Sequence, residues 1–316
     1  MQRVIVAVLP EVEVLDFAGP VQAFHEANRH GGDYDVHVCA PEPRVRTAQG
    51  VWLADLTPLP GDVTGDDLVV VPGIVLATLP SVDRSVFRWL RQVHDRGAHL
   101  ASICTGAFLL GEAGLLDGRQ CTTHWSRVDD LARRFPRARV LTNRLFVDDG
   151  RITTSAGIVS GVDMALALIE RRHGPLVTVA AARELVVYLR RDGAHQQQSV
   201  YLDYRTHLHP GVHRVQDWLI AHPAEKATLA DLARVAAMSP RNLTRAFRQA
   251  TGISIQDYRT RLRLELAKSL LHDPGMTVEA VAVRCGFESA RQLRRLFKET
   301  LGEAPSHLRP GDRNAH

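Results

Sequence analysis

The chain has 316 residues, of which 45% are hydrophobic and 23% are charged, and its formal net charge at pH 7 is +4. These values are typical of a globular protein of about two domains. No apolar run approaches the roughly 18 residues that a transmembrane helix needs, and the N-terminal apolar stretch is too short and too strand-like for a signal peptide. We therefore expect a cytoplasmic protein without a membrane partner.

Cysteine and histidine usage argues against two further classes. The 15 histidines are scattered, and the cysteines form neither a CxxC pair nor a regular ladder of spacings. A disulfide framework and a zinc site are therefore not expected, and we expect no metal and no cofactor. The four cysteines are Cys39, Cys104, Cys121 and Cys285.

The first 190 residues alternate between strand-like and helix-like segments. Apolar, β-branched runs without clean polar alternation predict strands that are buried on both faces. Segments with helical periodicity lie between them, and this alternation predicts a parallel sheet covered on both faces. Strands are predicted at residues 3–9, 35–40, 67–73 and 99–103, and helices at 21–28 and 81–96. A short strand and turn at 120–125, a helix at 126–134, a hairpin at 146–155 and helices at 162–172 and 176–190 complete the domain.

Small residues surround Cys104 at the point where the fourth strand is expected to turn into a helix. This pattern is typical of a nucleophile elbow, in which a strained turn lifts the side chain above the carboxyl end of the sheet. The N-terminus of the following helix would favour a thiolate. A buried structural cysteine explains the local pattern equally well.

Over residues 3–190 these motifs resemble the PfpI/ThiJ superfamily, whose flavodoxin-like fold is that of the class I glutamine amidotransferases. The resemblance implies a pocket where a carboxylate after the first strand meets the elbow cysteine and often a histidine. The matching positions are Asp16, Cys104 and His124. A packed core histidine and a helix N-terminal cap are the simpler interpretations of His124 and Asp16. For Asp163, near a predicted helix start, we prefer an interaction with the helix dipole.

Whether this pocket performs chemistry depends on the residue after the cysteine. Protease- and glyoxalase-like members have a histidine there as general base, whereas this chain has Thr105. A set of Asp16, Cys104 and Thr105 resembles the isocyanide-hydratase branch, but regulators of this superfamily carry it too. We favour a ligand pocket or a structural remnant over an active enzyme.

A polar, glycine-containing stretch without apolar periodicity separates this domain from the rest of the chain. We predict an α/β domain at residues 1–190, a linker at 191–210, a helical domain at 211–309 and a tail at 310–316. Residues 1–190 carry a net charge of −2 and residues 191–316 a net charge of +6. The positive excess in the helical domain indicates nucleic acid as its partner.

The helical domain contains one pattern twice, beginning at Thr228 and at Thr277. Each copy has an apolar helical face, a turn, and a second helix with buried positions such as Leu243 and Leu293. Basic residues occupy the outward positions of that second helix, as in a helix-turn-helix that reads the major groove. One copy alone would fit a plain helical bundle, but two in tandem favour DNA binding.

The repeat resembles the DNA-binding domain of the AraC/XylS family, and residues 257–271 match its central linker helix. The sequence departs from the family's pattern at His307-Leu308, where an aromatic residue is more usual. The resemblance implies DNA contacts, with base readout favoured for Arg245 and Arg295 and helices spaced about 34 Å apart. The residues that match DNA-facing positions are Arg241, Thr244, Arg245, Ala290, Arg291, Arg294 and Arg295.

The combination of the two domains resembles the GlxA-like transcription regulators. We therefore predict a non-enzymatic, sequence-specific DNA-binding regulator in the bacterial cytoplasm, associated with the nucleoid. Its expected partners are double-stranded operator DNA, a small-molecule effector, a second copy in a homodimer and, as a further partner, the transcription machinery. The alternative is a cysteine-dependent hydratase or amidase with an accessory DNA-binding domain.

Overall fold

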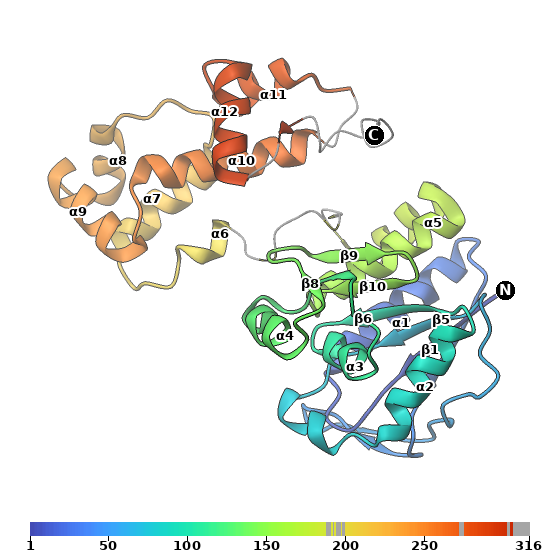
Figure 1. Cartoon of the computed structure of the whole chain (residues 1–316). Helices are drawn as coiled ribbons and strands as arrows, with labels where there is room; N and C mark the ends of the chain where they lie inside the picture. Colours follow the sequence, from blue (N-terminus) through green and yellow to red (C-terminus); the bar gives the residue numbers. More distant parts are fainter. Residues whose placement is uncertain are drawn as a thin grey trace. The chain divides into compact units, whose positions relative to one another are not determined.

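The computed structural model describes residues 1–187, 191, 193, 197, 200–271, 275–301 and 304–305 (Figure 1). The chain forms two compact units, Met1–Gln197 and Gln198–His316. The boundary between the two units falls inside the linker expected at residues 191–210, and the boundaries of that linker stay a prediction. The expected tail at 310–316 and the His307-Leu308 dipeptide lie outside the described residues.

The first unit is built on a six-stranded sheet with the order β2-β1-β5-β6-β10-β9. All neighbouring pairs are parallel except β10 and β9, which form the predicted hairpin at one edge. The order of the parallel strands is the flavodoxin-like one, which confirms the predicted fold class. The strands are β1 (Gln2–Ala7), β2 (Tyr34–Cys39), β5 (Leu68–Val71), β6 (His99–Ile103), β9 (Phe146–Asp149) and β10 (Ile152–Ser155).

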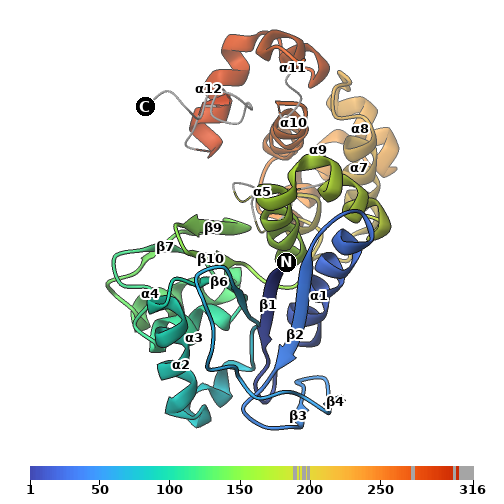
Figure 2. The ribbon, with the colours of Figure 1, turned by 90° about the vertical axis from the view of Figure 1, so that its right-hand side faces the viewer.

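Helices cover both faces of this sheet, because its central strands are apolar on both sides. All four residues of β5 are buried, and Val4, Ile5 and Val6 of β1 are completely buried. Figure 2 shows α2 and α3 on one face and α1 and α5 on the other. These helices are α1 (Val14–Arg29), α2 (Arg84–Asp95), α3 (Gly106–Glu112) and α5 (Val159–Glu184).

Helix α1 begins earlier than predicted and runs through Gly19 and Pro20, which in the sequence had indicated a loop. Tertiary packing explains the difference. A Cβ added at Gly19 would lie 2.9 Å from Val162 Cγ2 of α5, so glycine allows the two helices to approach closely. The correction matters for the site, because it places Asp16 in the first turn of α1 instead of in a loop before it.

The two helices predicted at 162–172 and 176–190 form the single element α5, which is interrupted at Gly174 (φ 77°, ψ 179°). Residues 188–190 lie outside the described part of the chain. Smaller elements complete the unit and were mostly not predicted. They are β3 (Val45–Arg46), β4 (Trp52–Leu53), β7 (Gln120–Cys121), β8 (Arg139–Val140), the 3₁₀ turns η1 (Leu76–Ser81) and η2 (Trp125–Arg127), and α4 (Val128–Arg134).

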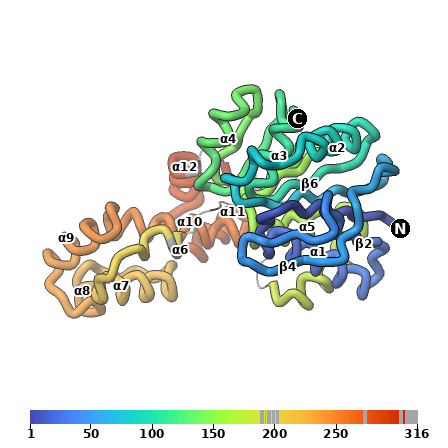
Figure 3. Tube along the Cα trace, turned by 90° about the horizontal axis from the view of Figure 1, so that it is seen from below, coloured from blue at the N-terminus to red at the C-terminus, as the bar shows by residue number. Residues whose placement is uncertain are grey.

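The second unit is helical. Figures 1 and 3 show α7, α8 and α9 gathered at one end of the long helix α10, and α11 and α12 at its other end. The helices are α6 (Val200–Asp203), α7 (Pro210–Ala221), α8 (Leu229–Ala236), α9 (Pro240–Thr251), α10 (Ile255–Leu271), α11 (Val278–Arg284) and α12 (Ala290–Leu301). No helix in the described part of either unit is long and apolar enough to cross a membrane.

Both repeats fold as helix, turn and helix, and their capping residues explain the boundaries. Thr228 forms a capping box with Asp231 at the start of α8, and Thr277 Oγ1 accepts a hydrogen bond from Ala280 N at the start of α11. The turns pass through left-handed residues, Ala237 (φ 54°) and Gly286 (φ 74°). A Cβ at Gly286 would lie 2.5 Å from the carbonyl oxygen of Ala224, so this turn requires glycine.

Arginine side chains tie the segments of the helical unit to one another. Arg214 of α7 donates to the carbonyl oxygens of Val235 and Ala236, which end α8. Arg263 of α10 donates to Pro223 O at 2.8 Å. Burial lowers the pKa of Arg263. Part of the positive charge counted in the sequence therefore serves the fold.

Candidate functional site

Cys104 lies between the end of β6 and the start of α3 with φ 54°, a left-handed backbone that non-glycine residues rarely adopt. Its N–H donates to Ser155 O of β10 at 2.9 Å, which holds the strained turn in place. This is the geometry expected of an elbow. We use the name Cys104 cluster for Asp16, Gly73, Cys104, Thr105 and Gly157.

Asp16 is completely buried, and its carboxylate is held by backbone groups from two other segments. Oδ2 accepts from Gly73 N at 3.2 Å and Oδ1 from Ile158 N at 2.8 Å. Neither bond serves the helix to which Asp16 belongs, so the structure does not support the helix-cap interpretation. The carboxylate instead ties the start of α1 to the loops that follow β5 and β10.

Two glycines make room for the cluster. A Cβ at Gly73 would lie 2.5 Å from Asp16 Oδ2 and 2.8 Å from Thr105 Oγ1. It would also lie 3.1 Å from Cys104 Cβ, so three side chains from two segments converge on Gly73. On the other side, a Cβ at Gly157 would lie 2.7 Å from Cys104 Cβ and 3.0 Å from its Sγ. The contributing segments follow β1, β5, β6 and β10, which is where ligands bind in open α/β sheets.

Thr105 occupies the position next to the cysteine and uses its hydroxyl within the fold. Its Oγ1 donates to Ile74 O at 2.6 Å and accepts from Ile74 N at 2.9 Å. The residue is 7% exposed. A hydroxyl bound to both the N–H and the carbonyl of one residue fixes the loop after β5, but it supplies no base for Cys104.

The electrostatics of the cluster oppose thiolate formation. Burial, and next to it the charge of Asp16, raise the pKa of the Cys104 thiol to about 12, although hydrogen bonds from Thr105 lower it. Burial also raises the pKa of Asp16 to about 6 against the hydrogen bonds from Ile158 and Gly73. The expectation that the α3 N-terminus would favour a thiolate is therefore wrong, because burial and a neighbouring carboxylate outweigh the helix end.

His124 lies in the loop after β7, where its Nδ1 is 2.8 Å from Ser126 Oγ. Burial, followed by the charge of Arg127, lowers its pKa. The neighbouring Thr123 reaches the elbow directly, since its Oγ1 donates to Cys104 O at 2.7 Å. The structure thus brings Asp16, Cys104 and Thr105 together, and joins the 122–124 segment to them through Thr123. A role for His124 in the pocket stays a prediction.

Sequence reasoning missed Gln197, for which no local signal exists. This residue from the expected linker lies against the α/β unit, where its Nε2 donates to the carbonyl oxygens of Thr123 and Arg144, both at 2.9 Å. Nearby, Arg191 forms an ion pair with the buried Asp163 at 2.6 Å. The sequence indicated only an interaction of Asp163 with the dipole of α5, and the structure adds this ion pair with Arg191.

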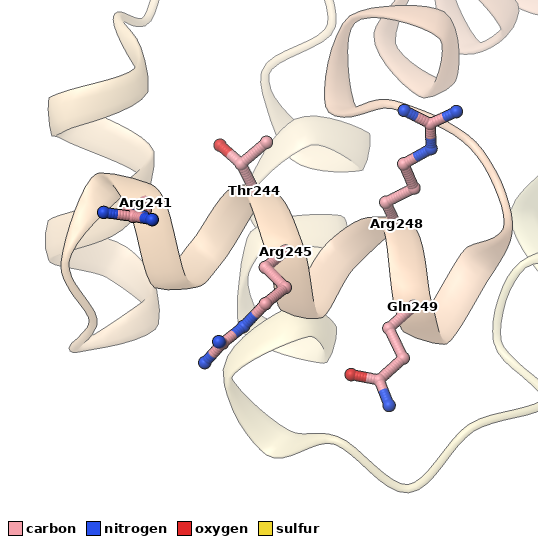
Figure 4. Close-up of a pocket in the computed structure, with 5 residues that line it drawn as sticks. All are labelled: Arg241, Thr244, Arg245, Arg248 and Gln249. Carbon is pink, nitrogen blue, oxygen red and sulfur yellow. The ribbon is translucent and has the colours of Figure 1, made fainter.

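The second candidate site is the outward face of α9. Leu243 and Phe247 are completely buried in the helical core, which turns the opposite side of the helix to solvent. Figure 4 shows the side chains that line an open hollow of about 480 Å³ on this face. They are Arg241, Thr244, Arg245, Arg248 and Gln249, of which the last two were not among the predicted site residues.

The matching face of α12 presents the other predicted residues. Arg291, Arg294 and Arg295 are exposed, and Ala290 is half-buried at the first position of the helix. Arg294 Nη2 lies 2.9 Å from Glu279 Oε1, and Arg295 Nη1 lies 3.0 Å from Glu299 Oε2. Both faces carry the guanidinium groups that phosphates and guanine edges require.

Two other features bear on ligands. Within the described ranges, no group of three histidine, cysteine, aspartate or glutamate side chains is placed to hold a metal ion. A separate hollow of about 130 Å³ lies in the α/β unit beyond the ends of β1 and β2. It is lined by Leu9, Pro10, Pro41, Glu42, Thr78, Ser81, Val82, Asp83 and Val86.

Comparison with known proteins agrees with both units. Residues 2–171 match the DJ-1/PfpI family, and residues 232–310 match a helix-turn-helix domain family. The HTH-type transcriptional regulator CdhR of Pseudomonas aeruginosa is 32% identical over 304 residues, which cover 95% of this chain and 89% of CdhR. The regulator GlxA of Rhizobium meliloti is 33% identical over 227 residues, covering 70% of this chain and 68% of GlxA.

A solved structure supports the fold of the first unit. The crystal structure of an AraC family transcriptional regulator from Pseudomonas putida has a TM-score of 0.54 and 23% identity, covering 58% of this chain and all of that one. Relatives matched over most of the chain are named as regulators, in agreement with the expectation of a regulator and not an enzyme. The chain belongs to the DJ-1/PfpI family and is a DNA-binding transcription regulator whose second unit is an AraC-type helix-turn-helix domain.

Proposed function

We propose that this regulator responds to a small metabolite that binds at the Cys104 cluster. The observation that carries the proposal is the convergence of Asp16, Cys104 and Thr105 at the carboxyl end of the sheet. They meet around Gly73, where any larger residue would clash with them. Asp16 is fully buried, and its raised pKa of about 6 makes it sensitive to a ligand that brings charge or hydrogen-bond donors. Cys104 remains partly exposed and is the cluster's contact to the outside.

The described linker residues suggest how occupation of the cluster reaches the DNA-binding unit. Thr123 donates to Cys104 O through its hydroxyl and accepts from Gln197 Nε2 through its carbonyl. A ligand that shifts the elbow therefore acts on two consecutive hydrogen bonds that end in the linker. We propose that the linker position, and with it DNA affinity, depends on this route.

We further propose that the regulator binds its operator as a homodimer in the bacterial cytoplasm, on the nucleoid, where it acts on the transcription machinery. Exposed apolar side chains at the starts of α1 and α5 support a self-association surface on the first unit. Leu15 is 58% exposed and Val159 is 63% exposed, and the hydrogen bond between Asp16 and Ile158 brings these two starts together. Leu15→Asp with Val159→Asp should shift the full chain from dimer to monomer in light scattering.

DNA contacts are proposed for both helices that follow the turns. Arg241, Thr244 and Arg245 of α9 would contact one major groove, and Ala290 with Arg291, Arg294 and Arg295 of α12 the next. Alanine substitution of a base-reading arginine should relax specificity at one base pair, whereas loss of a phosphate contact should weaken all sequences alike. Binding of Arg245→Ala to single-base variants of a selected duplex separates these two roles.

The effector site can be tested with a panel of amines, amino acids and carboxylic acids that are screened for thermal stabilisation of the full-length protein. Each compound that stabilises is measured again on Asp16→Asn and on Glu42→Gln, which alters the separate 130 Å³ hollow. We expect the stabilisation to vanish in Asp16→Asn and to persist in Glu42→Gln. The opposite pattern would move the effector to the other hollow and refute the proposal.

A further inference from the structure

The two helix-turn-helix units have the same arrangement of helices, but the outward arginines of their second helices have different neighbours. Their alignment pairs Thr228 with Thr277 and Leu243 with Leu293. On the outward face, Arg245 of α9 corresponds to Arg295 of α12, so any difference between these two arginines arises from their neighbours.

In the second unit, two of the three outward arginines, Arg294 and Arg295, are held by carboxylates of the chain itself. Arg295 Nη1 lies 3.0 Å from one oxygen of Glu299 and 3.1 Å from the other, one helical turn further along α12. Arg294 is bound across the unit by Glu279 of α11 at 2.9 Å. Both pairs lie on the surface, with side chains that are between 54% and 66% exposed.

In the first unit, the corresponding acids are missing from the sequence. Gln249 stands where the second unit has Glu299, and Ala230 stands where it has Glu279. Among the residues that the structure describes, Arg241, Arg245 and Arg248 form no ion pair. These arginines line an open hollow together with Gln249, so their guanidinium groups face solvent on one side of α9 (Figure 4).

A carboxylate next to an arginine weakens DNA binding in two ways. The guanidinium must leave its partner before it binds a phosphate, and the carboxylate then faces the phosphate backbone at close range and repels it. Fewer counterions are released when the arginine already has a negative partner, so the salt dependence of binding falls as well.

We propose that the two units bind DNA unequally. The α9 unit anchors the protein through free arginines, and Glu299, with Glu279, limits the affinity of the α12 unit. This proposal rests on the DNA-binding function of the domain. It adds which residues determine how much each unit contributes to DNA affinity. It assigns to two exposed glutamates a role in tuning affinity, although neither is placed among the DNA contacts.

The test uses the full-length protein and a duplex enriched from a random-sequence library by that protein, with affinity measured by fluorescence anisotropy over a series of salt concentrations. Arg245→Ala should weaken binding about tenfold or more and lower the salt slope by about one, whereas Arg295→Ala should weaken it less than about threefold. Glu299→Gln should strengthen binding about threefold, and the mirror variant Gln249→Glu should weaken it by a similar factor.

Asp66→Asn is the matched control, because it removes one exposed negative charge in the α/β unit and should leave affinity unchanged. Circular dichroism of each variant checks that the helices are intact. The proposal is overturned if Arg245→Ala and Arg295→Ala weaken binding equally, or if Glu299→Gln leaves the affinity unchanged while the wild-type protein binds the selected duplex. Failure of the wild-type protein to enrich any sequence would instead contradict specific DNA binding itself.

Discussion

The Cys104 cluster and the α9 face use polar side chains in opposite ways. In the cluster, the carboxyl of Asp16 is buried and the thiol of Cys104 is partly buried, and their pKa values are raised to about 6 and about 12. On α9, Arg241 and Arg245 lie on the surface without a carboxylate partner in the described part of the chain. Close packing and hydrogen bonds determine the properties of the Cys104 cluster, whereas accessible positive charge determines those of the α9 face.

This difference indicates which perturbation each region will register. A buried group responds to protonation, volume and nearby donors, because each changes its desolvation. An exposed arginine responds to salt and to long-range charge, and its removal should cost little folding energy. The distinction would fail if variants of the Cys104 cluster responded mainly to salt, or if variants of the α9 arginines mainly changed the stability of the fold.

The largest expected effect is a pH-dependent loss of stability caused by Asp16. Because its pKa of about 6 in the folded protein lies above the unfolded value of 3.8, its contribution to stability is complete below about pH 4 and is lost as the pH rises through about 6. Relative to Asp16→Asn, the wild-type protein should lose about 3 kcal/mol of unfolding free energy between pH 3 and pH 8, measured by urea unfolding. A difference between the two proteins that stays constant with pH would contradict the raised pKa.

Alkylation of Cys104 should be about 100-fold slower than that of a free cysteine at pH 7.5. A pKa of about 12 lowers the thiolate fraction about a thousandfold, and the higher intrinsic nucleophilicity of a more basic thiolate recovers part of this factor. Peptide mass spectrometry after iodoacetamide treatment measures the rate at each cysteine, with N-acetylcysteine and urea-unfolded protein as controls. A rate as fast as that of the free thiol would revive the cysteine-enzyme alternative.

Adding a methyl group at the centre of the Cys104 cluster should reduce the stability of the fold almost as much. Gly73→Ala places a Cβ 2.5 Å from Asp16 Oδ2 and 2.8 Å from Thr105 Oγ1, so we expect a loss of about 2 kcal/mol in unfolding free energy. Gly61→Ala is the matched control, because its Cβ would meet nothing within 4 Å. Equal stabilities of the two variants would show that the cluster is less rigid than its geometry indicates.

The sequence predicted those features that depend on local chemistry. Apolar runs located β5 and β6, and small residues marked the turn at Cys104. Helical periodicity located α8 and α9, whose first turns the structure shows to be capped by Thr228 and Ser239. These signals work because strand burial, tight turns and helix caps each involve neighbouring residues.

Features that depend on distant partners could not be predicted. The hydrogen bond from Ile158 to Asp16 joins residues 142 positions apart. The burial that raises the pKa of Asp16 likewise depends on segments far away in the sequence. Gly19 reads as a helix breaker until α5 is known to pack against it. The pair of Arg295 and Glu299 is visible as an i, i+4 spacing, whereas the contact of Arg294 with Glu279 requires the fold.

The smallest expected effect separates structural arginines from DNA-facing ones within the helical unit. Arg263→Ala removes donors to Pro223 O at 2.8 Å and to Glu225 O at 3.3 Å, so we expect unfolding of this unit to require about 1.5 kcal/mol less. Arg241→Ala is the comparison, because an exposed side chain without an ion pair in the described residues should change stability by less than about 0.5 kcal/mol. Its effect should appear in DNA affinity instead, measured by anisotropy on the same selected duplex. If Arg241→Ala destabilised the fold as much as Arg263→Ala, the division between inward and outward arginines would not hold, and with it the assignment of the α9 face to DNA.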